Sequence, residues 1–214
     1  AFAQHVTCNN TRYITDEFIN ADTTTAILFG NNTTFGGNNQ DLYMDIYEPA
    51  GDVATTRPVI IIAFGGQFIA GTRQDVSELC NYYAKRGFVA ASIDYRLFDG
   101  QLFPLPTSSD ITDVLIKASS DMKAAVRFLK EDAATSNTYK IDSNFIFIGG
   151  IGSGAIVANH VAYLDSTDSV SPSVSNAVAA NGSWTGNSST NLQHSNSVAG
   201  VLNFSGALID TSYI

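Results

Sequence analysis

The chain has 214 residues, of which 44% are hydrophobic and 14% charged, and its formal net charge is −9. This hydrophobic content is enough to form one core, and no stretch has the composition of a linker, so we expect a single domain. The negative charge argues against nucleic acid and anionic membranes as partners, because an acidic surface attracts neither. No apolar run reaches the ~20 residues that cross a bilayer, so we expect no membrane span.

The first residues favour export. The chain begins AFAQ, and the small-x-small pattern of residues 1–3 is typical of the end of a secretory signal peptide, although three residues can match by chance. We therefore expect a signal-peptide remnant at 1–3 and a secreted protein, extracellular or periplasmic. In such an oxidising compartment Cys8 and Cys80 would form a disulfide, whereas in the cytosol they would be free, buried thiols. Neither cysteine has metal-ligand spacing, so we expect no metal and no cofactor.

Strand and helix patterns alternate along the rest of the chain. Leu42–Tyr47 alternates as a half-exposed strand does, and Val59–Phe64 is a continuous apolar run typical of a strand buried on both faces. Further core strands are expected at Phe88–Ile93, Phe145–Ile148 and Val198–Phe204. Apolar residues at helical spacing predict helices between Asp75 and Gly87, from Ile111 to Leu129 and from Ala155 to Leu164. This order predicts a mostly parallel sheet with helices on both faces.

A polar segment, Ser166–Ser197, separates the last expected helix from the last expected strand. It is rich in Ser, Asn and Gly, and it contains no Lys or Arg. We interpret it as a solvated surface loop, and a lid or recognition loop over a site is the alternative.

Four segments in this order carry a family resemblance: RPVIIIAFGGQFIAGT, AKRGFVAASIDYRL, AAVRFLK and FIFIGGIGSGAI. Together they resemble the esterase and lipase branch of the α/β-hydrolase fold, near the carboxylesterases and the hormone-sensitive-lipase-like enzymes. The resemblance runs from about Leu42 to Ile209. It implies one α/β-hydrolase domain over residues 4–214, and we expect this domain to lack the C-terminal strands that carry the triad acid and histidine.

The resemblance also assigns a loop that would stabilise an oxyanion. Residues Phe64–Phe68 stand where the family has H-G-G-G-F, a loop whose backbone N–H groups form part of the oxyanion hole. Gly65 and Gly66 are kept, whereas Phe64 replaces the histidine and Gln67 the third glycine. A plain turn between strand and loop is the alternative interpretation of the two glycines.

FIFIGGIGSGAI has the strand–turn–helix pattern of a nucleophile elbow, G-x-S-x-G. Gly150 and Gly154 are then the outer glycines, and Gly152 stands where the family has its serine. Ser153 could be the nucleophile instead only if the residues two positions before it and two positions after it were small. The residue two positions before it is Ile151, which is bulky and β-branched. The resemblance therefore implies that Ser153 gives its backbone N–H to the oxyanion hole, with nucleophilic use of its hydroxyl as the weaker alternative.

The rest of a catalytic triad is also missing from the expected places. In this family the acid and the histidine follow strands that come after Phe204. Asp210 comes too early to be that acid, and no histidine follows His194. We expect His5, His160 and His194 to be structural or solvated.

The sequence thus predicts a secreted, carboxylesterase- or lipase-like protein that is catalytically incompetent. The alternative is a non-catalytic extracellular binding or structural protein that reuses the fold. Val198–Phe204 would end the sheet, and it has no Lys or Pro of the kind that protects natural edges. We therefore expect a second polypeptide, or another copy of this chain in a homo-oligomer, to cover that edge.

Overall fold

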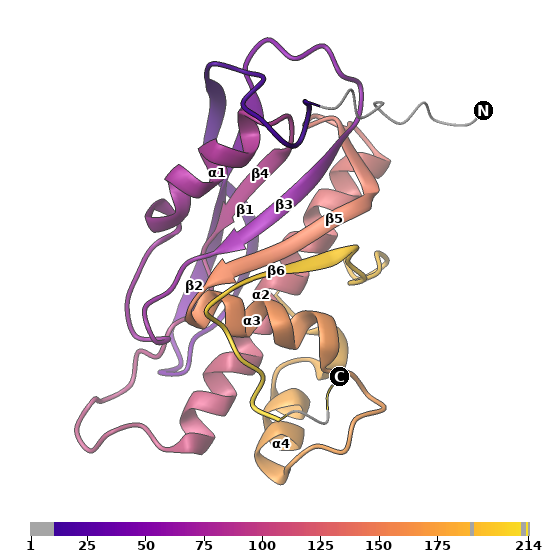
Figure 1. The fold of residues 1–214 in the computed structure, drawn as a ribbon. Helices are drawn as coiled ribbons and strands as arrows, with labels where there is room; N and C mark the ends of the chain where they lie inside the picture. Colours follow the sequence, from indigo (N-terminus) through magenta and orange to yellow (C-terminus); the bar gives the residue numbers. More distant parts are fainter. Residues whose placement is uncertain (1–10, 189–190, 211–212, 214) are drawn as a thin grey trace.

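A computed structural model describes residues 11–188, 191–210 and 213. Its sheet has the strand order β1-β2-β4-β3-β5-β6 (Figure 1). The strands are β1 (Ala21–Thr33), β2 (Asn39–Pro49), β3 (Arg57–Ala63), β4 (Val89–Ile93), β5 (Ile141–Ile151) and β6 (Gly200–Phe204). The four strands β4, β3, β5 and β6 run parallel, while β2 pairs antiparallel with both β1 and β4. The predicted mostly parallel sheet is confirmed.

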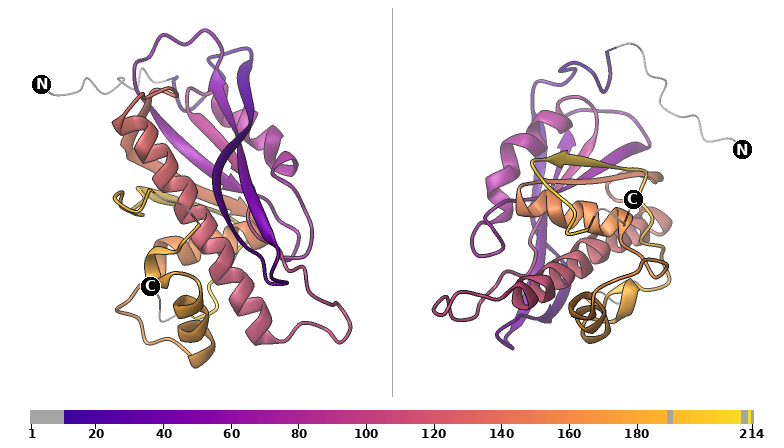
Figure 2. Two further views of the ribbon diagram at one scale, coloured as in Figure 1. Left: turned by 180° about the vertical axis from the view of Figure 1, so that it is seen from behind. Right: turned by 60° about the horizontal axis from the view of Figure 1, so that its bottom comes forward.

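Helices cover both faces of this sheet, as predicted. They are a 3₁₀ turn (Arg73–Val76) leading into α1 (Ser77–Ala84), then α2 (Ser108–Ala134), α3 (Ser153–Tyr163), α4 (Pro172–Ala180) and a second 3₁₀ turn (Ser183–Thr185). Figure 2 shows α1 on one face and α2 with α3 on the other. The start of α2 is set by a capping box, in which Thr107 accepts from the Asp110 N–H and the Asp110 carboxylate accepts from the Thr107 N–H.

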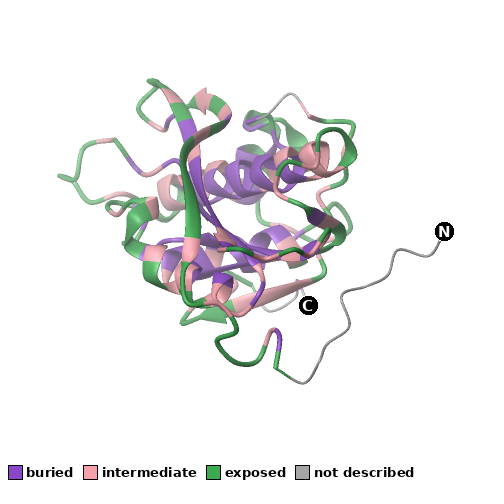
Figure 3. Cartoon of the chain, turned by 90° about the horizontal axis from the view of Figure 1, so that it is seen from above, coloured by how far each residue is buried: buried purple, intermediate pink, exposed green. Residues whose placement is uncertain are grey.

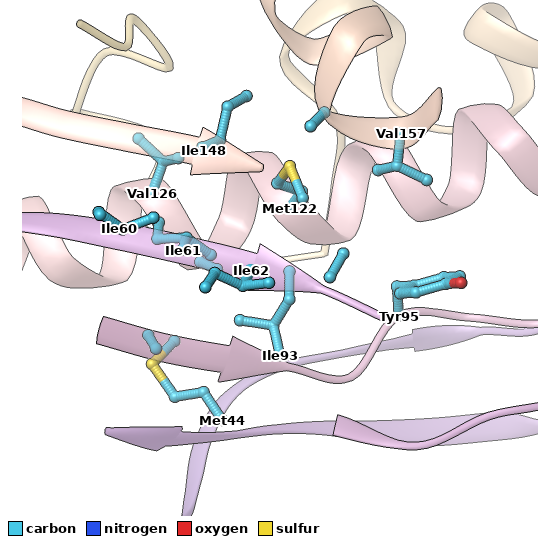
Figure 4. Packing of buried hydrophobic residues seen from close by; sticks show 14 of the residues in the cluster. Met44, Ile60, Ile61, Ile62, Ile93, Tyr95, Met122, Val126, Ile148 and Val157 are labelled. Atoms are coloured by element: carbon cyan, nitrogen blue, oxygen red, sulfur yellow. The ribbon is translucent and has the colours of Figure 1, made fainter. Parts of the chain in front are cut away.

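The core lies between the sheet and these helices (Figure 3). The residues from Val59 to Ala63 on β3 are all buried, which explains why that strand has a continuous apolar run. Ile60, Ile61 and Ile62 belong to the same apolar cluster as Met122 and Val126 of α2 (Figure 4). This packing fixes the carboxyl end of β3 against the carboxyl end of β5, where the candidate site lies.

Three parts of the fold differ from the sequence-based expectation. β1 was not predicted, because most of its residues are solvent-exposed and it has no apolar alternation. α4 lies inside Ser166–Ser197, which we expected to be a loop; its buried Val174, Ala177 and Val178 form a small second cluster. β6 is not a core strand: of the described strands it pairs only with β5, and its residues are half-buried or exposed.

The predicted Cys8–Cys80 disulfide is not formed in the structure. Cys80 is a free thiol on α1 and is completely buried in the main apolar cluster, so its sulfur faces core side chains. Cys8 and the possible signal remnant at 1–3 lie outside the described residues. Within the described helices, none has the length and apolar character needed to cross a bilayer.

Candidate active site

Gly152 forms a sharp turn between a strand and a helix. It stands between the end of β5 and the start of α3 (Figure 1), with φ 54° and ψ −116°, a region that side-chain-bearing residues rarely adopt. Its N–H donates to the carbonyl oxygen of Phe204 at 2.9 Å, which ties the turn to the end of β6. The tight strand–turn–helix predicted for FIFIGGIGSGAI is therefore present, with glycine at its centre.

The outer glycines are required by packing. A Cβ on Gly150 would lie 2.3 Å from the carbonyl carbon of Gly154, and a Cβ on Gly154 would lie 2.3 Å from the carbonyl oxygen of Ala63. A Cβ on Gly152, by contrast, would meet no atom within 4 Å. The backbone thus excludes a side chain at 150 and 154 and leaves open space for one at 152.

The hydroxyl of Ser153 points into the protein. Ser153 is only 5% exposed, and its Oγ lies 3.2 Å from the hydroxyl of Tyr95. Because that tyrosine hydroxyl donates to the carbonyl oxygen of Phe64 at 2.8 Å, Ser153 is the donor to Tyr95. Burial raises the pKa of Tyr95 to about 12, so the phenol is protonated at neutral pH and cannot act as a base for Ser153.

The loop after β3 lies against the elbow. A Cβ on Gly65 would be 3.0 Å from the carbonyl oxygen of Ile151. Gly66 adopts φ 127°, and its carbonyl oxygen accepts from the N–H groups of Ile69 and Ala70. Within the described part of the chain, the backbone N–H groups of Gly65, Gly66 and Ser153 donate to no other residue. They are free to bind an oxygen atom of a ligand.

Sequence reasoning missed the conformation of the next two residues of this loop. Gln67 and Phe68 have φ 59° and 64°, in the left-handed region that favours glycine. Gln67 stands where the resembled family has its third glycine, so the backbone keeps a glycine-like conformation although the side chain has changed. The mismatch with H-G-G-G-F was the available signal, but it does not by itself predict a positive φ.

The hydrogen-bond partners of the two described histidines, His160 and His194, do not include Gly152. His160 is buried on α3; its Nδ1 lies 2.7 Å from the Ile156 carbonyl oxygen, and its Nε2 accepts from the Ile209 N–H at 3.2 Å. Both ring nitrogens are therefore engaged by backbone, and burial lowers the pKa of His160. His194 precedes β6, lines a hollow with Ser143 at the opposite end of β5, and lies 2.6 Å from a Glu131 carboxylate oxygen.

His5 lies outside the described residues. Asp210 is solvent-exposed, and it follows Ile209, whose backbone N–H donates to His160 Nε2. In the described ranges, no three His, Cys, Asp or Glu side chains come together as metal ligands would. What this part of the structure offers chemically is therefore three backbone N–H donors without an acceptor among the described residues, and open space for a side chain at position 152.

Comparison with known proteins identifies the family. The sequence matches the BD-FAE family over residues 44–210. A thermophilic esterase from the planctomycete Thermogutta terrifontis superimposes in its native structure with a TM-score of 0.57 and 21% identity, over 90% of this chain and 55% of that one. Its butyrate-bound structure gives a TM-score of 0.59 and 22% identity, over 93% and 58%.

A bifunctional GH43-CE protein from Bacteroides eggerthii gives a TM-score of 0.61 and 24% identity, over 86% of this chain and 21% of that one. No curated protein matches the sequence. The chain thus spans little more than half the length of the Thermogutta esterase, and likenesses at these identities show the fold alone. Because the family match covers most of the chain, the protein belongs to the BD-FAE family, an α/β-hydrolase-like esterase family.

Proposed function

We propose that this chain is the elbow-bearing part of a secreted, carboxylesterase- or lipase-like protein that is catalytically incompetent in this form. The observation that carries the proposal is Gly152, which has the elbow conformation and open space around it but no nucleophilic atom. The family membership supports the esterase-like class. The small-x-small pattern at residues 1–3 supports secretion.

The proposed chemistry is that of acyl transfer with its first step missing. In a working enzyme of this class, a serine oxygen at position 152 would attack the ester carbonyl, and the N–H groups of Gly65, Gly66 and Ser153 would stabilise the oxyanion. Glycine supplies no such oxygen. Loss of the nucleophile in a serine protease lowers kcat by about a million-fold, so the expected turnover here is below ordinary detection.

The test is covalent labelling together with ester hydrolysis. We expect no labelling of the 214-residue chain by a fluorophosphonate probe and no hydrolysis of short-chain p-nitrophenyl esters above background. Gly152→Ser should also stay inactive in this chain, because neither His160 nor His194 is placed to act as its base. Labelling at Ser153, lost in Ser153→Ala, would overturn the proposal, as would turnover by Gly152→Ser.

A second candidate is a non-catalytic binding protein, and the free donors favour it. Three backbone N–H groups, those of Gly65, Gly66 and Ser153, have no acceptor among the described residues, which suits a carboxylate or an ester carbonyl that is bound and not cleaved. Calorimetric titration with butyrate would separate the candidates. Saturable binding without turnover would favour the binding protein, and no heat would favour an inactive relative of the esterases.

We also propose that a second polypeptide covers β6. Among the residues that the structure describes, this strand pairs with β5 alone, and Phe204 at its end is 39% exposed. An unprotected edge strand offers free N–H and C=O groups to any chain that can pair with it.

A further inference from the structure

The loop between β4 and α2 exposes a group of large apolar side chains. Leu102, Phe103 and Leu105 are 42%, 86% and 75% exposed. Among the described residues, no other four consecutive positions hold three exposed large apolar side chains. Single exposed apolar side chains are ordinary on protein surfaces, whereas a group of them marks a site of contact with a partner. We call residues 102–105 the loop tip.

The base of this loop is held in place by hydrogen bonds and ring packing. The Phe98 N–H donates to the Phe68 carbonyl oxygen at 2.7 Å, and the ring centroids of Phe98 and Phe35 lie 4.7 Å apart. The Asp99 carboxylate accepts from the Gly36 N–H, in the turn between β1 and β2, at 2.5 Å. At the other end of the loop, the capping box fixes the start of α2. The tip therefore stands on a fixed support.

The tip projects away from the body of the protein. Figures 1 and 2 show the loop extending outward beside the start of α2. Residues 101–105 are all exposed, so no described part of the chain covers them. Pro104 and Pro106 restrict the backbone of the tip, so little conformational freedom remains to be lost when a partner buries it.

The tip is uncharged. No charged side chain occurs between Asp99 and Asp110, and no Lys or Arg occurs between Arg96, which is buried, and Lys117. The whole chain has a net charge of −9. Contact through the tip therefore depends on the burial of apolar surface, and an anionic partner would be repelled.

The shape of the tip favours a fluid partner. Because the Phe103 side chain is exposed on nearly all sides, a flat protein surface would cover only part of it. The acyl chains of a lipid layer, by contrast, enclose an inserted side chain. A hollow on another copy of this chain is the alternative, since one apolar hollow is lined by Phe88, Phe145 and Phe147.

We propose that the loop tip inserts into a neutral, zwitterionic phospholipid layer, so that the chain binds such a surface peripherally. Phe103 and Leu105, the most exposed of the three apolar residues, supply most of the buried area. The absence of cations on the loop means that anionic lipid is not required. The insertion uses no residue of the esterase-like site, so it is independent of the proposed function.

Co-sedimentation of the 214-residue chain with vesicles of palmitoyl-oleoyl-phosphatidylcholine tests the proposal. Half of the chain should be bound at about 1 mM lipid. Phe103→Ser should weaken binding by about tenfold or more, because the aromatic ring then no longer transfers from water to the lipid. Replacing about a third of the lipid by phosphatidylglycerol should also weaken binding, because the vesicles and the protein then both carry negative charge.

Val53→Ser is the matched control. Val53 is 90% exposed and lies between β2 and β3. Because β2 runs antiparallel to β4, this position is at the end of the sheet opposite to the loop tip. Val53→Ser should therefore bind the vesicles as the wild-type chain does.

Phe103→Trp gives a second measurement that does not depend on a loss of binding. The chain has one tryptophan, Trp184, whose emission is subtracted by means of the wild-type chain. With the vesicles, emission of the new indole should shift to the blue and be quenched by lipids that carry bromine on their acyl chains. Val53→Trp should show neither effect.

Four results would overturn the proposal. The first is no sedimentation of the wild-type chain at about tenfold more lipid than the expected midpoint. The second is an equal loss of binding in Phe103→Ser and Val53→Ser, and the third is binding that requires phosphatidylglycerol. The fourth is self-association without lipid, measured by light scattering, that is lost in Phe103→Ser; it would show that the tip occupies a hollow of another copy.

Discussion

Ser153 Oγ donates to the hydroxyl of Tyr95 across 3.2 Å, and Tyr95 in turn donates to the Phe64 carbonyl oxygen at 2.8 Å. This short chain of hydrogen bonds joins α3, the segment after β4 and the loop after β3. It uses the Ser153 hydroxyl for a structural purpose, and the aromatic rings of Tyr95 and Phe64 stack 4.4 Å apart beside it. The relationship therefore supports position 152, and not 153, as the place of a nucleophile in this scaffold.

The hydrogen-bond chain predicts unequal effects of two conservative substitutions. Ser153→Ala removes one donor but leaves Tyr95 bonded to Phe64, so it should lower the free energy of unfolding by about 0.5–1.5 kcal/mol. Tyr95→Phe leaves both the serine hydroxyl and the buried carbonyl without this partner, and should lower it by about 1–3 kcal/mol. Urea unfolding measures both. A larger loss for Ser153→Ala would contradict the assigned donor direction.

Alanine substitutions at Gly150, Gly152 and Gly154 should distinguish the cost of an unfavourable backbone φ from the cost of a steric clash by the added Cβ. Gly152→Ala meets no atom but must adopt φ 54°, so we expect a loss of about 1–3 kcal/mol in unfolding free energy. Gly150→Ala and Gly154→Ala place Cβ 2.3 Å from backbone atoms, which cannot rotate away, so each should lose about 3 kcal/mol or more. Denaturant unfolding of the three variants measures the order. Equal losses at all three positions would show that the elbow has another conformation.

Those glycines also show why the elbow could be predicted from sequence. Gly150 and Gly154 are dictated by backbone contacts, so the spacing of these two glycines marks the turn whichever residue stands at position 152. The buried strand β3 was predictable for a similar reason, because burial on both faces demands an unbroken apolar run.

What could not be predicted depends on weaker or non-local constraints. β1 is an edge strand with threonines exposed to solvent, so no face has to be apolar. α4 buries only a few small residues. Its one local signal was Ser171, a residue favoured as an N-cap, followed by Pro172, a residue favoured at the first helical position. The direction of the Ser153 hydroxyl depends on Tyr95, which is 58 residues away in sequence.

Gln67 gives a stability prediction from its backbone alone. Its φ of 59° is unfavourable for any residue with a Cβ, and its side chain is exposed. Gln67→Gly should therefore raise the free energy of unfolding by about 0.5–1 kcal/mol, since relief of strain exceeds the entropy cost of glycine. Ala70→Gly in the same loop is the control; because φ is not positive there, it should lower stability. Thermal unfolding of both variants measures these changes. A lower stability of Gln67→Gly would contradict the claim that the backbone at position 67 is strained.

His160 predicts a loss of stability in mild acid. Burial lowers the pKa of His160 below the ordinary value for a histidine, so as the pH falls below about 6.5 the unfolded chain takes up a proton that the folded chain resists. The unfolding free energy should therefore decrease as the pH decreases, by at most about 1.4 kcal/mol per pH unit, until the lower pKa of the folded state is reached. Urea unfolding between pH 7.5 and 5.5 measures the slope. His160→Gln should reduce it, and an unchanged slope would exclude His160 as its source.

The exposed edge of β6 predicts association. In the described part of the sheet, β6 has β5 on one side and no strand on the other, and its residues Val201 and Leu202 are only half-buried. Pairing with another chain would satisfy its free N–H and C=O groups and cover apolar side chains, worth about 25 cal/mol for each Å² removed from water. Light scattering should therefore give a mass above the 22.8 kDa of one chain. Phe204→Lys places a charge on the edge and should lower that mass, whereas Leu192→Lys, at an exposed apolar position outside the strand, should not. A monodisperse, folded monomer of the wild-type chain would show that β6 is stable without a cover.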